Sequence, residues 1–206
     1  MLGKYKEAIE AFTKALKISP TYAMAYHSLG LAYFSAGEIE KSIKTLNRGV
    51  DLEPENGQAN FNLGAAYLRI RDNNKATKYL KKSIECGHNN AQTYKYLGIA
   101  YGASSRFEES VEAFKRSIVL DPDDPLTHFS LGKIFSSALH KDEEAIPYYI
   151  RCIEIAPSYV MAHYELVHCY MALNMRERAR NELTILRTYD LGLANSLLTS
   201  LNLNEK

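Results

Sequence analysis

Apolar and small residues recur along this chain at helical spacing. A first stripe, at positions i, i+3, i+4 and i+7, consists of Tyr26, Leu29, Gly30 and Tyr33. A second stripe follows a turn at 36–38 and consists of Ile39, Ser42, Ile43 and Leu46. Glycine inside a helix costs about 1 kcal/mol relative to alanine, so Gly30 needs a packing reason. The pattern predicts two short amphipathic helices that cross closely at this glycine.

The two-helix pattern repeats with a period of 34 residues. Leu-Gly pairs occur at 29–30, 63–64, 97–98 and 131–132, and Leu166-Val167 forms a fifth copy one residue late. Three residues after each pair stands an aromatic side chain, in the order Tyr33, Tyr67, Tyr101, Phe135 and Tyr170. Most copies close on a proline, namely Pro20, Pro54, Pro122 and Pro157. Several markers that share one period predict a helical-repeat protein.

The order aromatic, Leu-Gly, Tyr, small residue, Leu or Phe, and Pro resembles the tetratricopeptide repeat (TPR) over residues 4–188. The resemblance implies an all-α fold, a right-handed α-solenoid (superhelix) of antiparallel helix pairs. The expected single array has a half repeat at 4–22 and full repeats at 23–56, 57–90, 91–124, 125–159 and 160–190. A lone amphipathic helix at 191–203 is expected to cap the last repeat.

The chain departs from the repeat at its start. The apolar stripe of the half repeat is expected to lack the partner helix that would bury it, and consists of Tyr5, Ile9, Phe12 and Leu16. We favour the explanation that the chain is part of a longer protein. The alternative is that a partner or a second copy covers the stripe, which predicts self-association through the open half repeat.

The fourth full copy carries one extra residue within 136–142. We expect this residue to lengthen the turn between the two helices of the copy. Pro147 falls inside the second helix, close enough to its start, with Asp142 as a candidate cap, that a mild kink is expected rather than a break.

The resemblance implies that the first helix of each pair lines a concave peptide-binding groove. The candidate binding residues are Phe34, Phe61, Asn62, Leu68, Arg69, Lys95, Tyr96, Ile99, Phe129, Lys133, Tyr164 and His168. The wider face adds Met24, Leu31, Leu126 and Met161. A recurrent apolar and aromatic stripe indicates a partner peptide or helix with apolar anchors. The alternative is that these side chains pack against neighbouring helices or are scattered exposed residues.

One TPR subtype clamps the acidic tails of chaperones with Lys, Asn and Arg side chains on three consecutive helices. Asn62 stands where one clamp asparagine would. His27 and Leu31 occupy the clamp positions on the preceding helix, and Gln92 and Tyr96 occupy those on the next. A carboxylate needs the missing charged donors, so no carboxylate clamp for chaperone tails is expected.

Composition limits the remaining possibilities. The 206 residues carry 25 Lys and Arg against 24 Asp and Glu, a formal charge of +1, which argues against general nucleic-acid binding. No apolar run is long enough to span a membrane, so no membrane insertion is expected. Three widely spaced cysteines, Cys86, Cys152 and Cys169, suit a reducing compartment, which favours a cytoplasmic location.

No group of residues predicts catalysis, a metal or a cofactor. His163, His168 and Cys169 share one predicted helix, but two histidines five residues apart point to different faces. His128 and His163 take the register of Tyr26 and are expected to fill the helix-pair core instead. Cys86-Gly87-His88 lies in a turn between repeats, and the chain contains no Gly-rich phosphate loop and no nucleophile elbow.

The leading hypothesis is a non-enzymatic scaffold or adaptor that binds a protein or peptide partner. The alternative is the regulatory or substrate-recruiting TPR region of a larger protein, which could be an enzyme. An RNA-binding helical-repeat protein is a weaker third hypothesis, because the period is 34 residues and the net charge is near zero.

Overall fold

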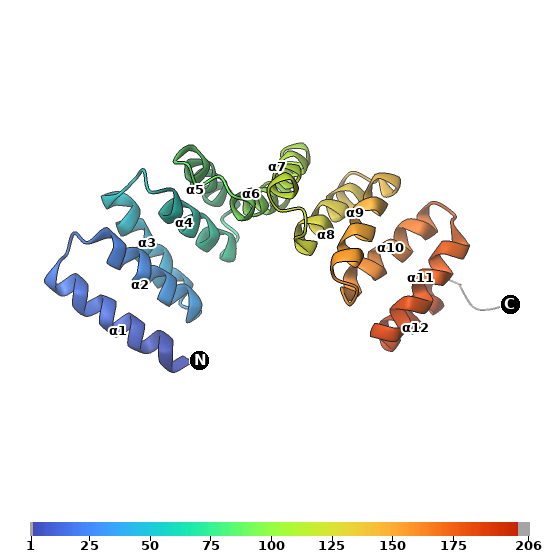
Figure 1. Cartoon of the computed structure of the whole chain (residues 1–206), viewed down its shortest axis with the longest axis horizontal. Helices are drawn as coiled ribbons and strands as arrows, with labels where there is room; N and C mark the ends of the chain where they lie inside the picture. Colours follow the sequence, from blue (N-terminus) through green and yellow to red (C-terminus); the bar gives the residue numbers. More distant parts are fainter. Residues whose placement is uncertain (1, 202–206) are drawn as a thin grey trace. The chain divides into compact units, whose positions relative to one another are not determined.

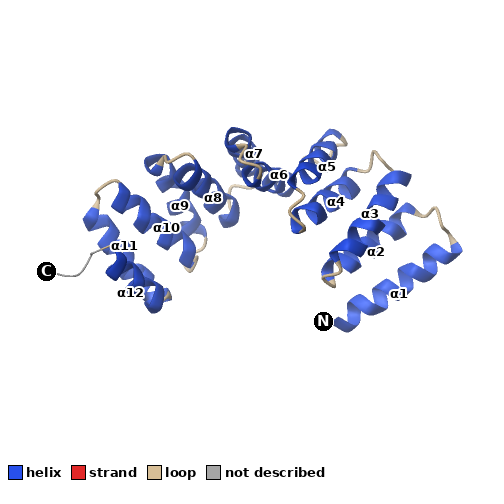
Figure 2. Cartoon of the chain, turned by 180° about the vertical axis from the view of Figure 1, so that it is seen from behind, coloured by secondary structure: helices blue, strands red, loops and turns tan. Residues whose placement is uncertain are grey.

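The computed structural model describes the backbone of residues 2–201 and the side chains of residues 5–201. Within these residues every regular element is a helix (Figure 2). The elements are α1 Leu2–Ile18, α2 Ala23–Ser35, α3 Ile39–Leu52, α4 Gly57–Arg69, α5 Asn73–Glu85, α6 Ala91–Ala103, α7 Phe107–Leu120, α8 Pro125–Lys133, the π-helical segment η1 Ile134–Ala138, α9 Asp142–Ile155, α10 Val160–Ala172, α11 Arg176–Tyr189 and α12 Leu191–Ser200. The predicted all-α class is confirmed.

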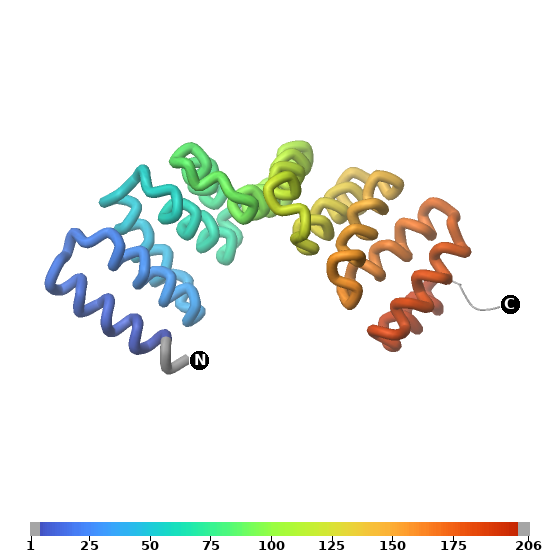
Figure 3. Tube along the Cα trace, in the orientation of Figure 1, coloured from blue at the N-terminus to red at the C-terminus, as the bar shows by residue number. Residues whose placement is uncertain are grey.

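The chain divides into two compact units, Met1–Arg106 with α1 to α6 and Phe107–Lys206 with α7 to α12. In unit 1, α2 packs on α3 and α4 packs on α5 (Figure 1). In unit 2, the pairs are α8 with α9 and α10 with α11. Each second helix also packs on the first helix of the next pair within its unit, as the trace in Figure 3 shows. The boundary lies inside the expected repeat 91–124, and the continuity of one array across it stays a prediction.

Glycine lets the two helices of a pair approach closely. A Cβ atom on Gly30 would lie 2.5 Å from Cγ of Leu46, and one on Gly64 would lie 2.8 Å from Cγ of Leu80. Leu46 and Leu80 are both fully buried. The mid-helix glycines are therefore explained by packing, as their helix-propensity cost required.

A polar bond at the same register ties each first helix to the end of the preceding repeat. The side chain at this position donates to the carbonyl of the proline six residues earlier. The bonds are Tyr26 Oη to Pro20 at 3.2 Å, Asn60 Nδ2 to Pro54 at 2.9 Å, His128 Nε2 to Pro122 at 2.9 Å and His163 Nε2 to Pro157 at 2.7 Å. His128 and His163 are buried, which confirms their predicted place in the core. The carbonyl explains why polar residues occupy a core position.

The turn after the first helix of each repeat contains one residue in the left-handed conformation. These residues are Gly37, Arg71, Ser105, His140 and Asn174, with φ values of 80°, 60°, 58°, 55° and 57°. Only the first is glycine, which adopts this conformation without steric cost. The other four accept a conformation that L-residues disfavour because the tight turn requires it.

The prediction of a longer turn in the fourth copy is wrong. The turn after η1 is three residues, 139–141, the same length as the turn at 104–106. The extra residue is taken up inside the helix, where the π-helical segment Ile134–Ala138 widens the last turn. The Leu139 amide donates to the Ile134 carbonyl at 3.0 Å, five residues back, which is the spacing of a π-helix. A widened turn keeps the buried Phe135 in register.

The start of α9 also differs from the prediction. The cap is Lys141, and Asp142 is the first residue of the helix rather than its cap. Asp142, Glu143 and Glu144 place three carboxylates in the first turn, where negative charge favours the helix dipole. The helix runs through Pro147 to Ile155 without a break, because proline near the N-terminus removes few intrahelical hydrogen bonds.

The N-terminal stripe has more cover than the sequence indicated. Helix α1 packs on α2, and Tyr5, Ile9, Phe12 and Leu16 are all half-buried. The expectation that these side chains lack a helix to pack on is therefore wrong for their α2 side. At the other end, α12 packs on α11 and buries Ala194 and Leu197, while residues 202 and 203 of the expected cap lie outside the described residues.

Candidate peptide-binding site

The first-helix face of unit 1 comprises the groove candidates on α2, α4 and α6. Two apolar side chains of this face are well exposed, Met24 at 54% and Leu31 at 43%. Arg69 is exposed, and the half-buried residues of the face are Phe34, Leu68, Lys95, Tyr96 and Ile99. Aliphatic and aromatic surface thus remains open at Met24 and Leu31 and is partly covered elsewhere.

Phe61 of α4 contributes to packing between repeats. It is only 6% exposed, and its ring lies 5.3 Å from that of Tyr96 on α6 in an edge-on arrangement. Its ring centroid is also 5.5 Å from that of His88 in the loop before α6. Edge-on aromatic pairs of this kind add to the stability of a core. Phe61 therefore supports Tyr96 from behind and presents little surface of its own.

Asn62 is 7% exposed, and its Oδ1 accepts a hydrogen bond from Gln58 Nε2 at 3.0 Å. His27, in a clamp position on α2, is buried, and this burial lowers the pKa of its imidazole. Neither residue offers a charged donor to a carboxylate, which agrees with the expectation drawn from the sequence.

The first-helix face of unit 2 comprises the candidates on α8 and α10. Leu126 and Met161 are its most exposed apolar residues, at 41% and 43%. Phe129 is half-buried, with its ring centroid 5.0 Å from that of Tyr159. Lys133 of α8 forms an ion pair with Glu165 of α10 at 3.3 Å, so its charge is already partly neutralised within the face.

Tyr164 and His168 lie one turn apart on α10. Their ring centroids are 4.7 Å apart, and both side chains are half-buried. Nε2 of His168 is buried and has no hydrogen-bond partner among the described residues. A partner that approaches this pair would find two aromatic rings and one imidazole nitrogen with an unmet hydrogen bond.

His163 takes part in a buried ion pair that the sequence did not predict. The Pro157 carbonyl can only accept, so Nε2 of His163 carries a hydrogen, and Nδ1 donates to the Glu182 carboxylate of α11. Burial alone lowers the pKa of His163, but the bonds to Glu182 and Pro157 outweigh it and raise the pKa above its ordinary value. Its partner, 19 residues away, leaves no local sequence signal.

Two cysteines of unit 2 are poor nucleophiles. Burial raises the pKa of the Cys152 thiol to about 11. Burial and a hydrogen bond with Asp142 raise the pKa of Cys169 to about 12. Among the residues that the structure describes, no group of three His, Cys, Asp or Glu side chains is arranged to hold a metal ion.

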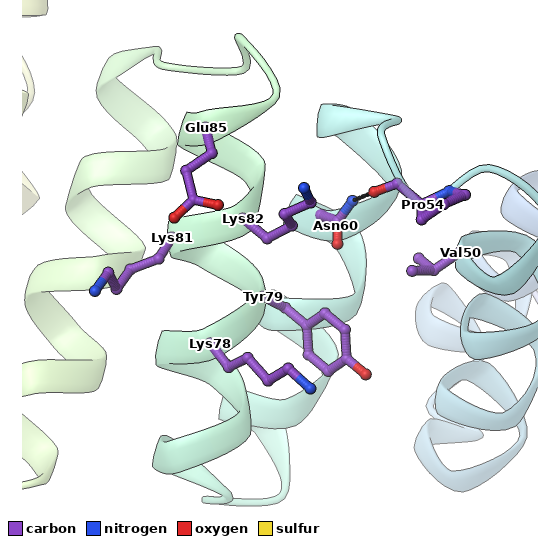
Figure 4. Close-up of a pocket in the computed structure, with 8 residues that line it drawn as sticks. All are labelled: Val50, Pro54, Asn60, Lys78, Tyr79, Lys81, Lys82 and Glu85. Carbon is purple, nitrogen blue, oxygen red and sulfur yellow. Dashed lines mark hydrogen bonds between the residues drawn. The ribbon is translucent and has the colours of Figure 1, made fainter.

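A pocket on the other side of unit 1 was not singled out by the sequence analysis. It opens between α3 and α5, has a volume of about 430 Å³, and is lined in part by Val50, Tyr79 and Lys78 (Figure 4). The available signal was the spacing of Lys78, Lys81 and Lys82 along one predicted helix.

Family models match both units of the chain. The model described as TPR repeat matches residues 2–37 and 30–70, and the model described as tetratricopeptide repeat matches 57–85 and 127–159. The chain belongs to the tetratricopeptide-repeat family. The resemblance inferred from the Leu-Gly, aromatic and proline markers is confirmed.

Solved TPR structures share the fold. The chain is similar to YrrB, described as a TPR protein with an unusual peptide-binding site, with a TM-score of 0.79 and 21% identity over 93% of this chain and 100% of that one. It is also similar to MamA, with a TM-score of 0.75 and 22% identity over 81% and 97% of the two chains. PilF of Pseudomonas aeruginosa gives 0.74 and 20% identity over 88% and 82%. A search of curated proteins gave no match. These identities establish the fold of this TPR chain.

The helices of residues 2–201 were also compared with the length and apolarity that a bilayer demands. None of them meets both requirements for crossing a membrane.

Proposed function

We propose that this TPR chain is a protein–protein interaction scaffold whose first-helix faces hold partner segments with apolar or aromatic anchors. The observation that carries the proposal is the exposure of four apolar side chains on these faces. They are Met24 and Leu31 in unit 1 and Leu126 and Met161 in unit 2. Flexible methionine and leucine side chains suit the binding of apolar anchors.

The other candidates divide into three roles. The half-buried Phe34, Leu68, Tyr96, Ile99, Phe129, Tyr164 and His168 would form the walls of the two faces. Arg69, Lys95 and Lys133 would supply polar contacts at their edges. Phe61 and Asn62 would hold these walls in place from the interior. The proposed role requires no catalytic step and no cofactor, and the three free cysteines favour a cytoplasmic location.

A pull-down from the source cell's lysate with quantitative mass spectrometry tests the proposal. The variant Met24→Ser/Leu31→Ser removes the exposed anchors of unit 1, and Leu126→Ser/Met161→Ser removes those of unit 2. The control Val119→Ser/Ile185→Ser makes the same kind of change at exposed positions on the second helices α7 and α11. Circular dichroism first establishes that every variant is folded.

The proposal expects at least one protein to be captured by the wild type and the control and lost with a face variant. If every captured protein binds all variants equally, the first-helix faces are not the binding site. Loss with only one of the two face variants would assign the partner to that unit.

A further inference from the structure

The two units carry opposite charge. Residues 1–106 contain 15 Lys and Arg against 9 Asp and Glu, a formal charge of +6, whereas residues 107–206 contain 10 against 15, a charge of −5. The total of +1 hides this asymmetry. A charge of this size creates a positive potential around unit 1, which attracts acidic partners and raises their association rate.

The pocket between α3 and α5, called here the α3/α5 pocket, combines apolar walls with lysines. Val50 of α3 and Pro54 after it face Tyr79 of α5 across the opening (Figure 4). Lys78 and Lys82 flank Tyr79, and Lys81 also lines the pocket. Its volume of about 430 Å³ lies within the range of ligand sites and accommodates a large aliphatic side chain.

The aromatic wall of the pocket is held in place before any partner binds. Tyr79 stacks on Tyr67 with a centroid distance of 5.6 Å and an interplanar angle of 5°. Its hydroxyl donates to Oδ1 of Asn47 at 3.4 Å, and Nζ of Lys78 lies 5.4 Å from its ring centroid. A wall fixed in this way loses little conformational entropy on binding. Because Tyr67 covers one face of the ring, a nucleic-acid base cannot be sandwiched there.

The inner end of the pocket offers a hydrogen-bond acceptor. Asn60 is 1% exposed, and its Nδ2 donates to the carbonyls of Pro54 and Asn56, both at 2.9 Å. This arrangement fixes the amide and leaves Oδ1 directed toward the gap between Tyr79 and Val50 (Figure 4). A backbone N–H group of an extended segment is the natural donor to such an oxygen.

The lysines differ in how far their charge is already neutralised. Lys82 pairs with Glu55 at 2.8 Å, and the Cys86 thiol donates to the same carboxylate at 3.2 Å. Among the described residues, no ion pair is recorded for Lys78 or Lys81. These two exposed ammonium groups are therefore available to a partner's carboxylates.

We propose that the α3/α5 pocket binds an acidic segment of a partner protein. One Leu, Ile or Phe side chain of the segment enters between Val50, Pro54 and Tyr79. The flanking Asp or Glu carboxylates contact Lys78 and Lys81, and a backbone N–H donates to Asn60. The site lies on the second-helix side of unit 1 and does not depend on the first-helix faces.

The test uses an array of fluorescein-labelled ten-residue peptides in which the numbers of Asp or Glu and of Leu, Ile or Phe vary independently. Fluorescence anisotropy with the full chain measures the affinity of each peptide at two salt concentrations. The proposal expects binding only when both residue classes are present. It also expects binding to weaken as salt rises, because exposed charges are screened.

Lys78→Glu reverses the charge beside Tyr79, and Lys44→Glu on α3 makes the same change at an exposed lysine outside the pocket lining. The proposal expects Lys78→Glu to weaken the best peptide at least about tenfold and Lys44→Glu to weaken it less than about twofold. Val50→Trp, which fills the pocket without changing charge, is expected to remove the preference for an apolar residue. Circular dichroism verifies that the three variants remain folded.

Several outcomes overturn the proposal. These are equal effects of Lys78→Glu and Lys44→Glu, affinity that depends on acidic residues alone, and the absence of binding to any peptide at millimolar concentration. A single-stranded oligonucleotide that binds in a Lys78-dependent way would replace the peptide with nucleic acid. A dimer in analytical ultracentrifugation that Lys78→Glu abolishes, without peptide binding, would make a second copy the occupant.

Discussion

The close helix crossing in unit 1 leads to a quantitative prediction for Gly64. A Cβ atom at this position would lie 2.8 Å from Cγ and 3.2 Å from the backbone nitrogen of Leu80. Leu80 is fully buried, so its side chain has no open space to enter, and its nitrogen moves only if α5 moves. Gly64→Leu places three further carbons in this space. Overpacking of this kind costs about 1–3 kcal/mol.

Helix propensity acts in the opposite direction. Leucine is favoured over glycine inside a helix by somewhat less than about 1 kcal/mol. A net destabilisation of about 2 kcal/mol therefore means that the steric cost exceeds the propensity gain. For a chain of this length it lowers the melting temperature by about 4–8 °C. Gly64→Ala, which adds the Cβ alone, is expected to fall between the wild type and Gly64→Leu.

The control is Gly192→Ala in α12. A Cβ on Gly192 would meet only Oδ1 of Asp190, at 3.5 Å, which is an ordinary contact. This variant is expected to keep or raise stability by up to about 1 kcal/mol, since only propensity changes. Thermal and urea unfolding followed by circular dichroism at 222 nm measure all three. An unchanged or higher midpoint for Gly64→Leu would show that α4 and α5 do not cross at this glycine.

Three further predictions concern the ion pair, the turns and the thiols. The raised pKa of His163 stabilises the fold below about pH 6.5, and this contribution is lost as pH rises through the folded value, so the stability difference between wild type and Glu182→Gln in urea titrations should be largest near pH 5.5 and shrink toward pH 8; a constant difference would refute the charged pair. Ser105→Gly relieves a left-handed φ of 58° and should raise the urea midpoint, by up to about 1 kcal/mol, whereas a lower midpoint would contradict this reading of the turn. Cys152 and Cys169 should resist a thiol reagent at pH 8 until urea unfolds unit 2, and fast labelling of either in the native protein would be evidence against their burial.

The repeat itself was readable because its markers carry direct physical constraints. Gly30 and Gly64 stand where helices cross, and the residues opposite them, Leu46 and Leu80, fill the crossing. These constraints recur at a fixed spacing, so one sequence is enough to detect them. The core positions of His128 and His163 followed from the same register.

Other features depend on details that spacing does not encode. An extra residue can enter a turn or a helix, and only the backbone shows that η1 absorbs it. The burial of Phe61 depends on the tilt of α6, which brings Tyr96 and His88 against it. The α3/α5 pocket joins two helices of different repeats, so neither helix alone reveals it. Long-range pairings of this kind need the structure.

The most direct test of the first-helix faces is hydroxyl-radical footprinting of the chain with a protein captured in the pull-down. Exposed methionines oxidise readily, and Met24 and Met161 lie on the two faces, while Met175 is exposed in the turn before α11. The account predicts that the partner lowers oxidation of Met24, Met161 or both several-fold and leaves Met175 unchanged. Oxidation of Met24 and Met161 that stays at the level of the free chain under saturating partner would contradict it.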